Sequence, residues 1–370
     1  NRRRWWLGVG LPMMGHDNDE DATGELEPGQ WLYPAVTQLV GQTADLNNAY
    51  WTKAAITIGA SANGADNNSD IQAIVGSAAN VAHGLTKAFT LTANYYTWSY
   101  DFAPGDLGFA RLTNNTIANC YAYFNLDTLT LGTVGAGVLN THIDPPFING
   151  VVRCHITFLG TAASHTLGMY AAESDNDTTY QGDASTPNIY AGSPQLTQSK
   201  YHHPFVRNTT GSPSVRSVDI SQQYKGDDGN INNTDRKGTI QLECHIPNVG
   251  SSIAPDSGTL LAMSDGGSAN DTIEISVDSS GDVTAASAAT AGDPGSSTAV
   301  GNISIAESIN VNVDFIDDGL KAIAIGTGAT DQSCDMPDDL DEIEFNSRAS
   351  SGQVGMFIEK LHIHKKPGAR

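Results

Sequence analysis

The sequence is poor in charge. Only 16% of its 370 residues are charged, against about 25% in a typical soluble domain. Lysine and arginine together number 19 and aspartate and glutamate 41, which gives a formal net charge of −22. Such a surface repels nucleic-acid phosphates and anionic membranes. Because long exposed helices depend on Lys–Glu pairs, the composition also disfavours a helical fold.

Long apolar runs, heptads and cysteine motifs are also missing. No stretch approaches the roughly 20 apolar residues that cross a bilayer, and no heptad pattern predicts a coiled coil. The four cysteines form no C-x-x-C motif, which disfavours a zinc site or a disulfide framework. Cys120 and Cys154 lie in apolar, β-rich stretches and are predicted as small buried side chains, with a bridge between them as the alternative.

The regular patterns that are present are short β-branched or alternating runs. Examples are residues 95–100, 151–158, 272–277 and 309–315. Clusters of Asn, Asp, Gly and Ser separate these runs and favour turns. We therefore predict an all-β chain built from two β-sandwich or jelly-roll domains in tandem.

Turn-rich joints suggest the domain organisation. Residues 1–45 are irregular and are predicted as an N-terminal docking arm, and residues 46–200 as a first β-sandwich. Residues 201–236 are rich in Pro, Gly, Asp and Asn and are predicted as a linker. Residues 237–370 are predicted as the second β-sandwich.

The start of the chain combines three basic and two large aromatic residues: Arg2, Arg3, Arg4, Trp5 and Trp6. Exposed side chains of this size leave about 1.5–3 kcal/mol of burial energy each unrealised, and Arg and Trp are enriched at interface hot spots. Gly and Pro interrupt the apolar stretch that follows, which counts against a signal peptide. We expect these five residues to dock on another protein subunit; the alternative is that they fold back on the acidic body of the chain.

Segments of the first β-domain resemble, in matching order, a jelly-roll module of bacteriophage virion proteins. The segments are 51–54, 89–93, 96–100, 122–126, 132–137, 153–158, 168–172, 180–183, 188–190 and 195–196. Val151-Val152 and Ala191-Gly192 stand where that module has aromatic residues. If those aromatics bind sugars in relatives, their loss argues against sugar binding at the same place here.

Segments of the second β-domain resemble the concanavalin A-like, laminin-G-like sandwich of phage appendage proteins. They are 238–240, 260–266, 273–278 and 355–361. Both resemblances imply a structural protein on the outer surface of a virion, as a fibre, tail appendage or capsid decoration. The implied partners are other virion subunits and host-surface glycans, and the implied state is a homo-oligomer, commonly a trimer. A capsid cement protein without a receptor role is the alternative.

One aromatic run offers a candidate glycan platform. Tyr96, Trp98 and Tyr100 share one face of a strand because side chains alternate. They form either a stacking surface for sugars or the core face of a sandwich, and the core is favoured.

An acidic run at 339–344 offers the one candidate catalytic cluster. It resembles the E-x-D-x-x-E strand of laminarinase-like glycosidases, which use paired carboxylates. Asp339 stands at the nucleophile's position, and no tryptophan follows Trp98 to line a sugar subsite. We predict no enzyme, with this run as a solvated acidic sheet edge. A secreted glycan-active enzyme using Asp339, Asp341 and Glu344 is the alternative.

Candidate metal ligands are few. His362 and His364 share a strand face but lack a third ligand, and they, like His202-His203, are predicted to be exposed. The loops 175–177 and 227–230 carry oxygen ligands without EF-hand spacing. We expect no cofactor, with Ca²⁺ in one of these loops as the alternative.

Overall fold

The computed structural model contains strands as its regular elements. It describes residues 24–25, 30–32, 35–63, 70–144, 146, 150–216, 221–223, 238–245, 257–264, 272–288, 296–302, 308–316, 319–324, 327–331, 342–345 and 356–364. Within these residues there is no helix, which confirms the all-β prediction. The described part of the chain accordingly offers no helix long and apolar enough to cross a membrane.

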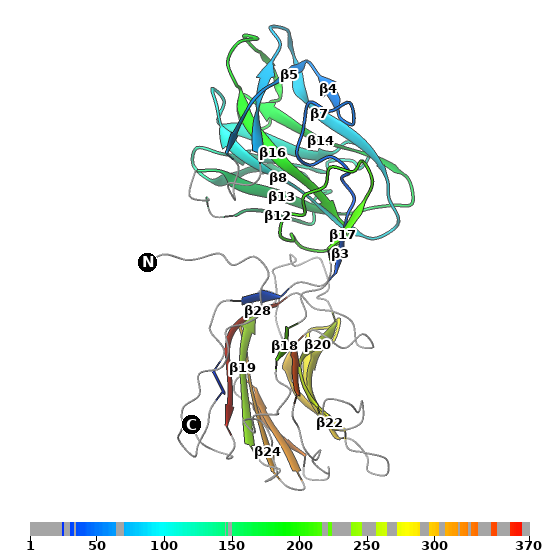
Figure 1. Cartoon of the computed structure of the whole chain (residues 1–370), viewed down its shortest axis with the longest axis vertical. Helices are drawn as coiled ribbons and strands as arrows, with labels where there is room; N and C mark the ends of the chain where they lie inside the picture. Colours follow the sequence, from blue (N-terminus) through cyan, green and yellow to red (C-terminus); the bar gives the residue numbers. More distant parts are fainter. Residues whose placement is uncertain are drawn as a thin grey trace. The chain divides into compact units, whose positions relative to one another are not determined.

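The chain divides into two compact units. The first unit is Val36–Arg216, and the second combines Asn1–Ala35 with Ser217–Arg370. Each unit contains two antiparallel sheets (Figure 1).

The first sheet of the first unit has seven strands in the order β11-β10-β9-β14-β7-β15, with β4 beside β7. The strands are β4 (Thr52–Ala54), β7 (Asn80–Thr90), β9 (Phe109–Asn114), β10 (Tyr121–Asn125), β11 (Thr130–Val134), β14 (Ser164–Ala172) and β15 (Thr179–Gln181). Tyr123 and Tyr170 lie directly opposite Arg111 on the two strands that flank β9.

The second sheet of the first unit has eight strands in the order β12-β13-β8-β16-β3-β17, with β6 beside β16 and β5 beside β6. The strands are β3 (Val36–Gln38), β5 (Ile56–Asn63), β6 (Asp70–Gly76), β8 (Tyr95–Pro104), β12 (Asn140–Ile143), β13 (Val152–Leu159), β16 (Ile189–Thr197) and β17 (Ser214–Arg216). The long strands β8, β13 and β16 form its centre.

The core of the first unit lies between its two sheets. Tyr96, Trp98 and Tyr100 are 2%, 0% and 0% exposed, and the Trp98 and Tyr100 rings meet edge to face at 5.0 Å. The Trp98 Nε1 donates a hydrogen bond of 3.2 Å to the backbone oxygen of Gly168 in the opposite sheet. The core interpretation of this aromatic run is confirmed. The glycan-platform alternative is wrong, because no sugar can reach a face that the other sheet covers.

The other face of the central strands β8, β13 and β16 is largely buried as well. Residues 198–213, which we call the covering segment, run from β16 to β17 and bury Tyr201, His203 and Asn208. The predicted linker is therefore wrong up to Arg216, which belongs to the first unit. The reason is that side chains of the sheet bond the backbone of this turn-rich segment, so its Pro and Gly residues shape a packed loop instead of a connector.

The predicted arm is also divided between the units. Val36–Gln38 is β3 of the first unit, where Val36 and Val40 are buried. β1 (Gly24–Glu25) and β2 (Gln30–Leu32) pair with β28 (Met356–His364) of the second unit. Short extended segments lower the free energy by pairing with the open edge of a sheet, which a composition-based boundary at residue 45 misses.

The second unit consists of two antiparallel sheets. The first has the strand order β1-β28-β19-β24-β25-β26, with β2 beside β28, and the second has the order β18-β27-β20-β21-β22-β23. Its further strands are β18 (Ser221–Gln223), β19 (Gly238–His245), β20 (Gly258–Ser264), β21 (Thr272–Val277), β22 (Asp282–Ala288), β23 (Ser296–Asn302), β24 (Ser308–Ile316), β25 (Gly319–Ala324), β26 (Thr327–Asp331) and β27 (Glu342–Phe345). Alternate residues are buried, such as Ile240 and Leu242, and Ile273 and Ile275.

Two local predictions have opposite outcomes. Cys120 and Cys154 are buried and unbridged, as small apolar side chains are expected to be. The prediction of an acidic sheet edge is wrong for Glu342–Phe345. This strand, β27, lies between β18 and β20 and pairs with a strand on both sides.

Candidate functional site

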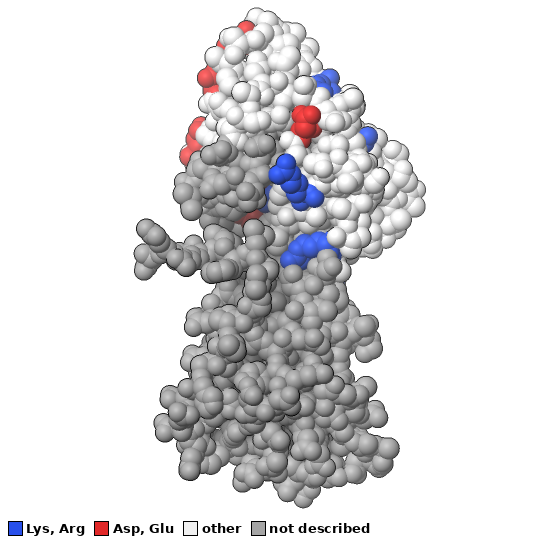
Figure 2. All heavy atoms as spheres, in the orientation of Figure 1, with Lys and Arg blue, Asp and Glu red and all other residues white. Residues whose placement is uncertain are grey.

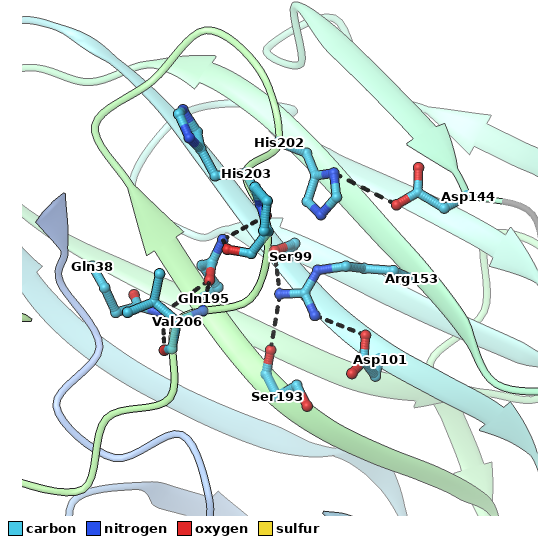
Figure 3. A network of polar contacts seen from close by, with 11 residues as sticks. Gln38, Ser99, Asp101, Asp144, Arg153, Ser193, Gln195, His202, His203 and Val206 are labelled. Carbon is cyan, nitrogen blue, oxygen red and sulfur yellow. Dashed lines mark hydrogen bonds and ion pairs between the residues drawn. The ribbon is translucent and has the colours of Figure 1, made fainter. Parts of the chain in front are cut away.

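A buried polar cluster lies under the covering segment, on the face of β8, β13 and β16 that points away from the core (Figure 3). Side chains alternate along strands, so the apolar positions of β13 enter the core while Arg153 and His155 project to this second face. Thr97, Ser99 and Asp101 do the same from β8. All five are buried.

Arg153 is the centre of this cluster. Its Nη1 donates to the Asp101 Oδ1 at 2.8 Å, and its Nη2 donates to the Ser99 Oγ at 3.1 Å and the Ser193 backbone oxygen at 3.2 Å. The two charged side chains are 4% and 2% exposed. An ion pair this deeply buried holds three strands in one arrangement, because either charge alone would be strongly disfavoured there.

Two glutamines attach the covering segment to this face. The Gln195 Nε2 donates to the His203 backbone oxygen at 2.9 Å, and the Val206 N donates to the Gln195 Oε1 at 2.8 Å. The Gln38 Nε2 donates to the Val206 backbone oxygen at 3.4 Å. Figure 3 shows these contacts beside the Arg153 cluster. The covering segment thus shields this polar face from solvent, and its hydrogen bonds to the glutamines replace those that they would otherwise make to water.

A cluster of histidines and one aspartate lies next to Arg153. His142 and His155 face each other across β12 and β13, Asp144 follows β12, and His202 comes from the covering segment. The His202 Nδ1 is 3.5 Å from the Asp144 Oδ2, and the His142 Nε2 is 3.9 Å from the Asp144 Oδ1. The His155 and His202 rings stack at 5.5 Å. Two neighbouring strands and the covering segment therefore bring four candidate ligands together.

Burial sets the protonation of this cluster. Desolvation lowers the pKa of His155 to about 3, with smaller contributions from His142 and Arg153. Desolvation holds the pKa of His202 well below its usual range, and the positive charge of Arg153 makes a smaller contribution in the same direction. Desolvation raises the pKa of Asp144, against which the nearby His142 and Arg153 act. His155 and His202 are therefore neutral at pH 7, with lone pairs available to a ligand.

A second candidate site lies on the outer face of the seven-stranded sheet. The Arg111 guanidinium carbon lies 4.7 Å from the ring centroid of Tyr121, 5.6 Å from that of Tyr123 and 5.8 Å from that of Tyr170. We call these four residues the tyrosine–arginine face. Arg111, Tyr121 and Tyr170 are partly exposed, and Tyr123 is buried.

Glycines and a hydrogen bond position the Tyr170 ring. A Cβ at Gly168 would lie 2.8 Å from the ring, and one at Gly84 would also contact it. The absence of side chains there lets the ring lie close to the strands. The Asn115 Nδ2 donates to the Tyr170 oxygen at 3.3 Å. The ring is thus held in place before any ligand arrives.

The remaining predicted site residues have different places. The docking residues Arg2–Trp6 lie outside the described residues, as do Asp339, Asp341 and the loop 227–230. Glu344 lies in β27 and His362 and His364 in β28, where the structure describes the backbone.

The loop 175–177 is an exposed turn. The Asp175 carboxylate accepts bonds from the Thr133 N and Oγ1 at 2.7 and 3.0 Å, and the Asp177 Oδ1 accepts one from the Thr179 N at 2.9 Å. Asp175 thus ties the loop to β11, and Asp177 accepts a bond within the loop itself.

The sequence-based prediction of exposed histidines is wrong for His203, which is buried and bonds the Ser199 Oγ at 2.9 Å. The prediction also missed both candidate sites. The signal for the tyrosine–arginine face was available, because Tyr121 and Tyr123 share a strand face by the same alternation that groups Tyr96 with Trp98.

The charge distribution on one face of the first unit adds no further candidate. Figure 2 shows one face of the first unit with few, separated charged side chains on its described surface. That face presents no basic patch of the kind that binds nucleic acid.

No family model matches the chain, and no curated protein matches it. Among solved structures, the chain is similar to the CBM40 of the Ruminococcus gnavus IT-sialidase, with 14% identity, 40% of this chain and 86% of that chain covered, and a TM-score of 0.31. The same module bound to alpha2,3 sialyllactose gives 15% identity, 36% and 78% covered, and a TM-score of 0.29. Domains LG4-5 of the mouse laminin alpha1 chain give 10% identity, 80% and 89% covered, and a TM-score of 0.27. Similarities at this level assign neither a family nor a ligand to this chain.

Proposed function

We propose that this chain is a non-catalytic structural protein of a bacteriophage particle that displays its β sandwiches for adhesion to host-surface glycans. The observation that carries the adhesive role is the tyrosine–arginine face, which gathers three aromatic rings around one cation on the outer surface of a sheet. Tyr and Arg are the residue types that dominate binding hot spots.

The chemistry of this face suits a sugar. The electron-rich face of a tyrosine ring attracts the slightly positive C–H groups of a pyranose, and the phenol offers a hydroxyl at the rim. The Arg111 guanidinium donates hydrogen bonds to sugar hydroxyls or to the carboxylate of an acidic sugar.

The particle role is supported by the sequence resemblance and by the place of its segments. The resemblance segments 122–126 and 153–158 coincide largely with β10 and β13, and the segments 188–190 and 195–196 lie largely in β16. They belong to the central framework of the first unit. Those segments supply packing and the Arg153 cluster, which suits a displayed structural module.

We expect Tyr170→Ala and Arg111→Met each to weaken glycan binding by about tenfold or more. Each variant removes one contact residue of a small site, and a loss of about 1.4 kcal/mol in binding free energy lowers the affinity tenfold. The full chain is screened on an array of neutral and acidic bacterial glycans, and affinities for the hits are measured by calorimetry. Tyr95→Ala is the matched control, since Tyr95 is a partly exposed tyrosine on the other sheet. Unchanged binding in Tyr170→Ala, or no hit for the folded wild-type chain, would overturn the adhesive role.

The particle role has a separate test. Mass spectrometry of purified virions from the phage that encodes the chain should detect it, and labelled antibody should place it on the particle surface. Its absence from purified particles would contradict the proposal. A polysaccharide-degrading activity of the full chain that Asp339→Ala, Asp341→Ala or Glu344→Ala abolishes would favour the enzyme alternative instead.

A further inference from the structure

We propose that Asp144, His155 and His202 form a binding site for a divalent transition metal of the Zn²⁺ class, which pins the covering segment to the sheet. Each residue offers one ligand atom, and the three atoms lie within 4.8 Å of one another. In a tetrahedral zinc site with bonds of about 2.0–2.1 Å the ligand atoms are about 3.4 Å apart. The 3.5 Å between the His202 Nδ1 and the Asp144 Oδ2 already matches that spacing.

An unsatisfied nitrogen atom is the second observation that points to a ligand. His155 is 5% exposed. Its Nδ1 is buried and has no hydrogen-bond partner. A buried polar atom without a partner costs free energy, and a coordinated metal ion removes that cost for a nitrogen that faces it.

One carboxylate in the cluster favours a cation. The positive charge of Arg153 acts against it, and the 2.8 Å ion pair with Asp101 offsets part of that charge. The Asp144 carboxylate is largely withdrawn from water, and the described contacts of its oxygens are to His202, which is neutral at pH 7, and to His142. A divalent ion would supply the missing positive charge next to this carboxylate.

The donor set selects the metal class. Two imidazole nitrogens and one carboxylate oxygen suit Zn²⁺ and its neighbours, whereas Ca²⁺ and Mg²⁺ require mainly oxygen ligands. His142 is the nearest further donor, since its Nε2 is 3.9 Å from the Asp144 Oδ1 and its side chain is 61% exposed. The solvent side of the site is therefore open to a fourth ligand.

The consequence for the fold is a cross-link. Asp144 follows β12, His155 lies in β13, and His202 begins the part of the covering segment that lies over Arg153. A metal that binds all three in the folded chain stabilises that state by mass action. It would hold the covering segment closed over the Arg153 cluster.

Calorimetry with Zn²⁺ and visible absorption of Co²⁺ test the site in the full chain. We expect binding of one ion, the absorption bands of tetrahedral Co²⁺, and a rise of a few degrees in the unfolding temperature of the first unit. Asp144→Asn and His202→Ala should each weaken binding at this site at least tenfold and remove the temperature rise. Asp144→Asn preserves side-chain shape, and circular dichroism of the metal-free variants checks that both fold.

The matched control is the double variant His362→Ala/His364→Ala, which removes the other histidine pair of the sequence. It should bind Zn²⁺ as tightly as the wild-type chain. Binding that this control loses and His202→Ala retains would overturn the proposal, as would no binding at all by the wild-type chain. Neither result depends on glycan binding, because no residue is shared with the tyrosine–arginine face.

Discussion

Arg153→Met should destabilise the first unit by about 3–5 kcal/mol, which is the usual effect of removing one partner from a buried ion pair. Methionine keeps most of the length of the side chain, so the loss is mainly electrostatic. Asp101 would remain buried without its 2.8 Å cationic partner, and the Ser99 hydroxyl and the Ser193 backbone oxygen would each lose a donor. Urea unfolding followed by hydrogen exchange of peptides from β8, β13 and β16 measures the loss.

Two comparisons make this result specific. Arg207→Met removes an arginine from an exposed position of the covering segment and should change stability by no more than about 0.5 kcal/mol. The double variant Asp101→Leu/Arg153→Met removes both charges. Its loss of unfolding free energy should be markedly smaller than the sum of the losses in the two single variants. A loss below about 1 kcal/mol in Arg153→Met would mean that water reaches Asp101, and would contradict a sealed polar face.

The alternation of apolar and polar residues predicted one face of the eight-stranded sheet well. Trp98, Cys154 and Ile156 occupy alternate positions of their strands and enter the core. The opposite face carries Ser99, Asp101 and His155, and a period-2 pattern assigns such residues to solvent. What buries them is a segment about 50 to 100 residues further along the chain, and no local pattern reports that contact.

The candidate sites were missed for the same reason, because each depends on contacts between segments that are not adjacent in the sequence. The tyrosine–arginine face needs Arg111 of β9 between Tyr123 of β10 and Tyr170 of β14. The strand pairing that places them together is a property of the sheet order, which periodicity does not encode. The histidine cluster is harder still to predict, because His202 lies in a loop whose composition is typical of a linker.

Domain boundaries failed for a related reason. Composition marks where the chain is rich in turn-forming residues, as it is at 201–236. It does not report which sheet edge a short extended segment pairs with. β3 and β17 pair through Val36–Gln38 and Ser214–Arg216, and this pairing joins the two ends of the first unit.

Trp98→Ala should be the most damaging single truncation in the core, with an expected loss of about 3–5 kcal/mol. The side chain is fully buried, and its ring lies 6.5 Å from that of Trp51 and 6.1 Å from that of Phe89. Alanine would leave a cavity where the two sheets meet and would remove the bond from the indole Nε1 to the Gly168 oxygen. The same exchange-resolved urea unfolding measures this loss.

Leu159→Ala and Trp98→Phe separate the causes of that loss. Leu159 ends β13 on the same sheet but is 51% exposed, so its truncation should cost far less than that of Trp98. Trp98→Phe keeps much of the ring volume while losing the hydrogen bond, and should fall between the two. If Trp98 belonged to a surface platform for glycans, its truncation would reduce binding with little change in stability. The buried position predicts the reverse. Trp98→Ala should unfold the first unit at a lower urea concentration. At urea concentrations where that unit is still folded, its glycan affinity should equal that of the wild-type chain, because the tyrosine–arginine face is intact.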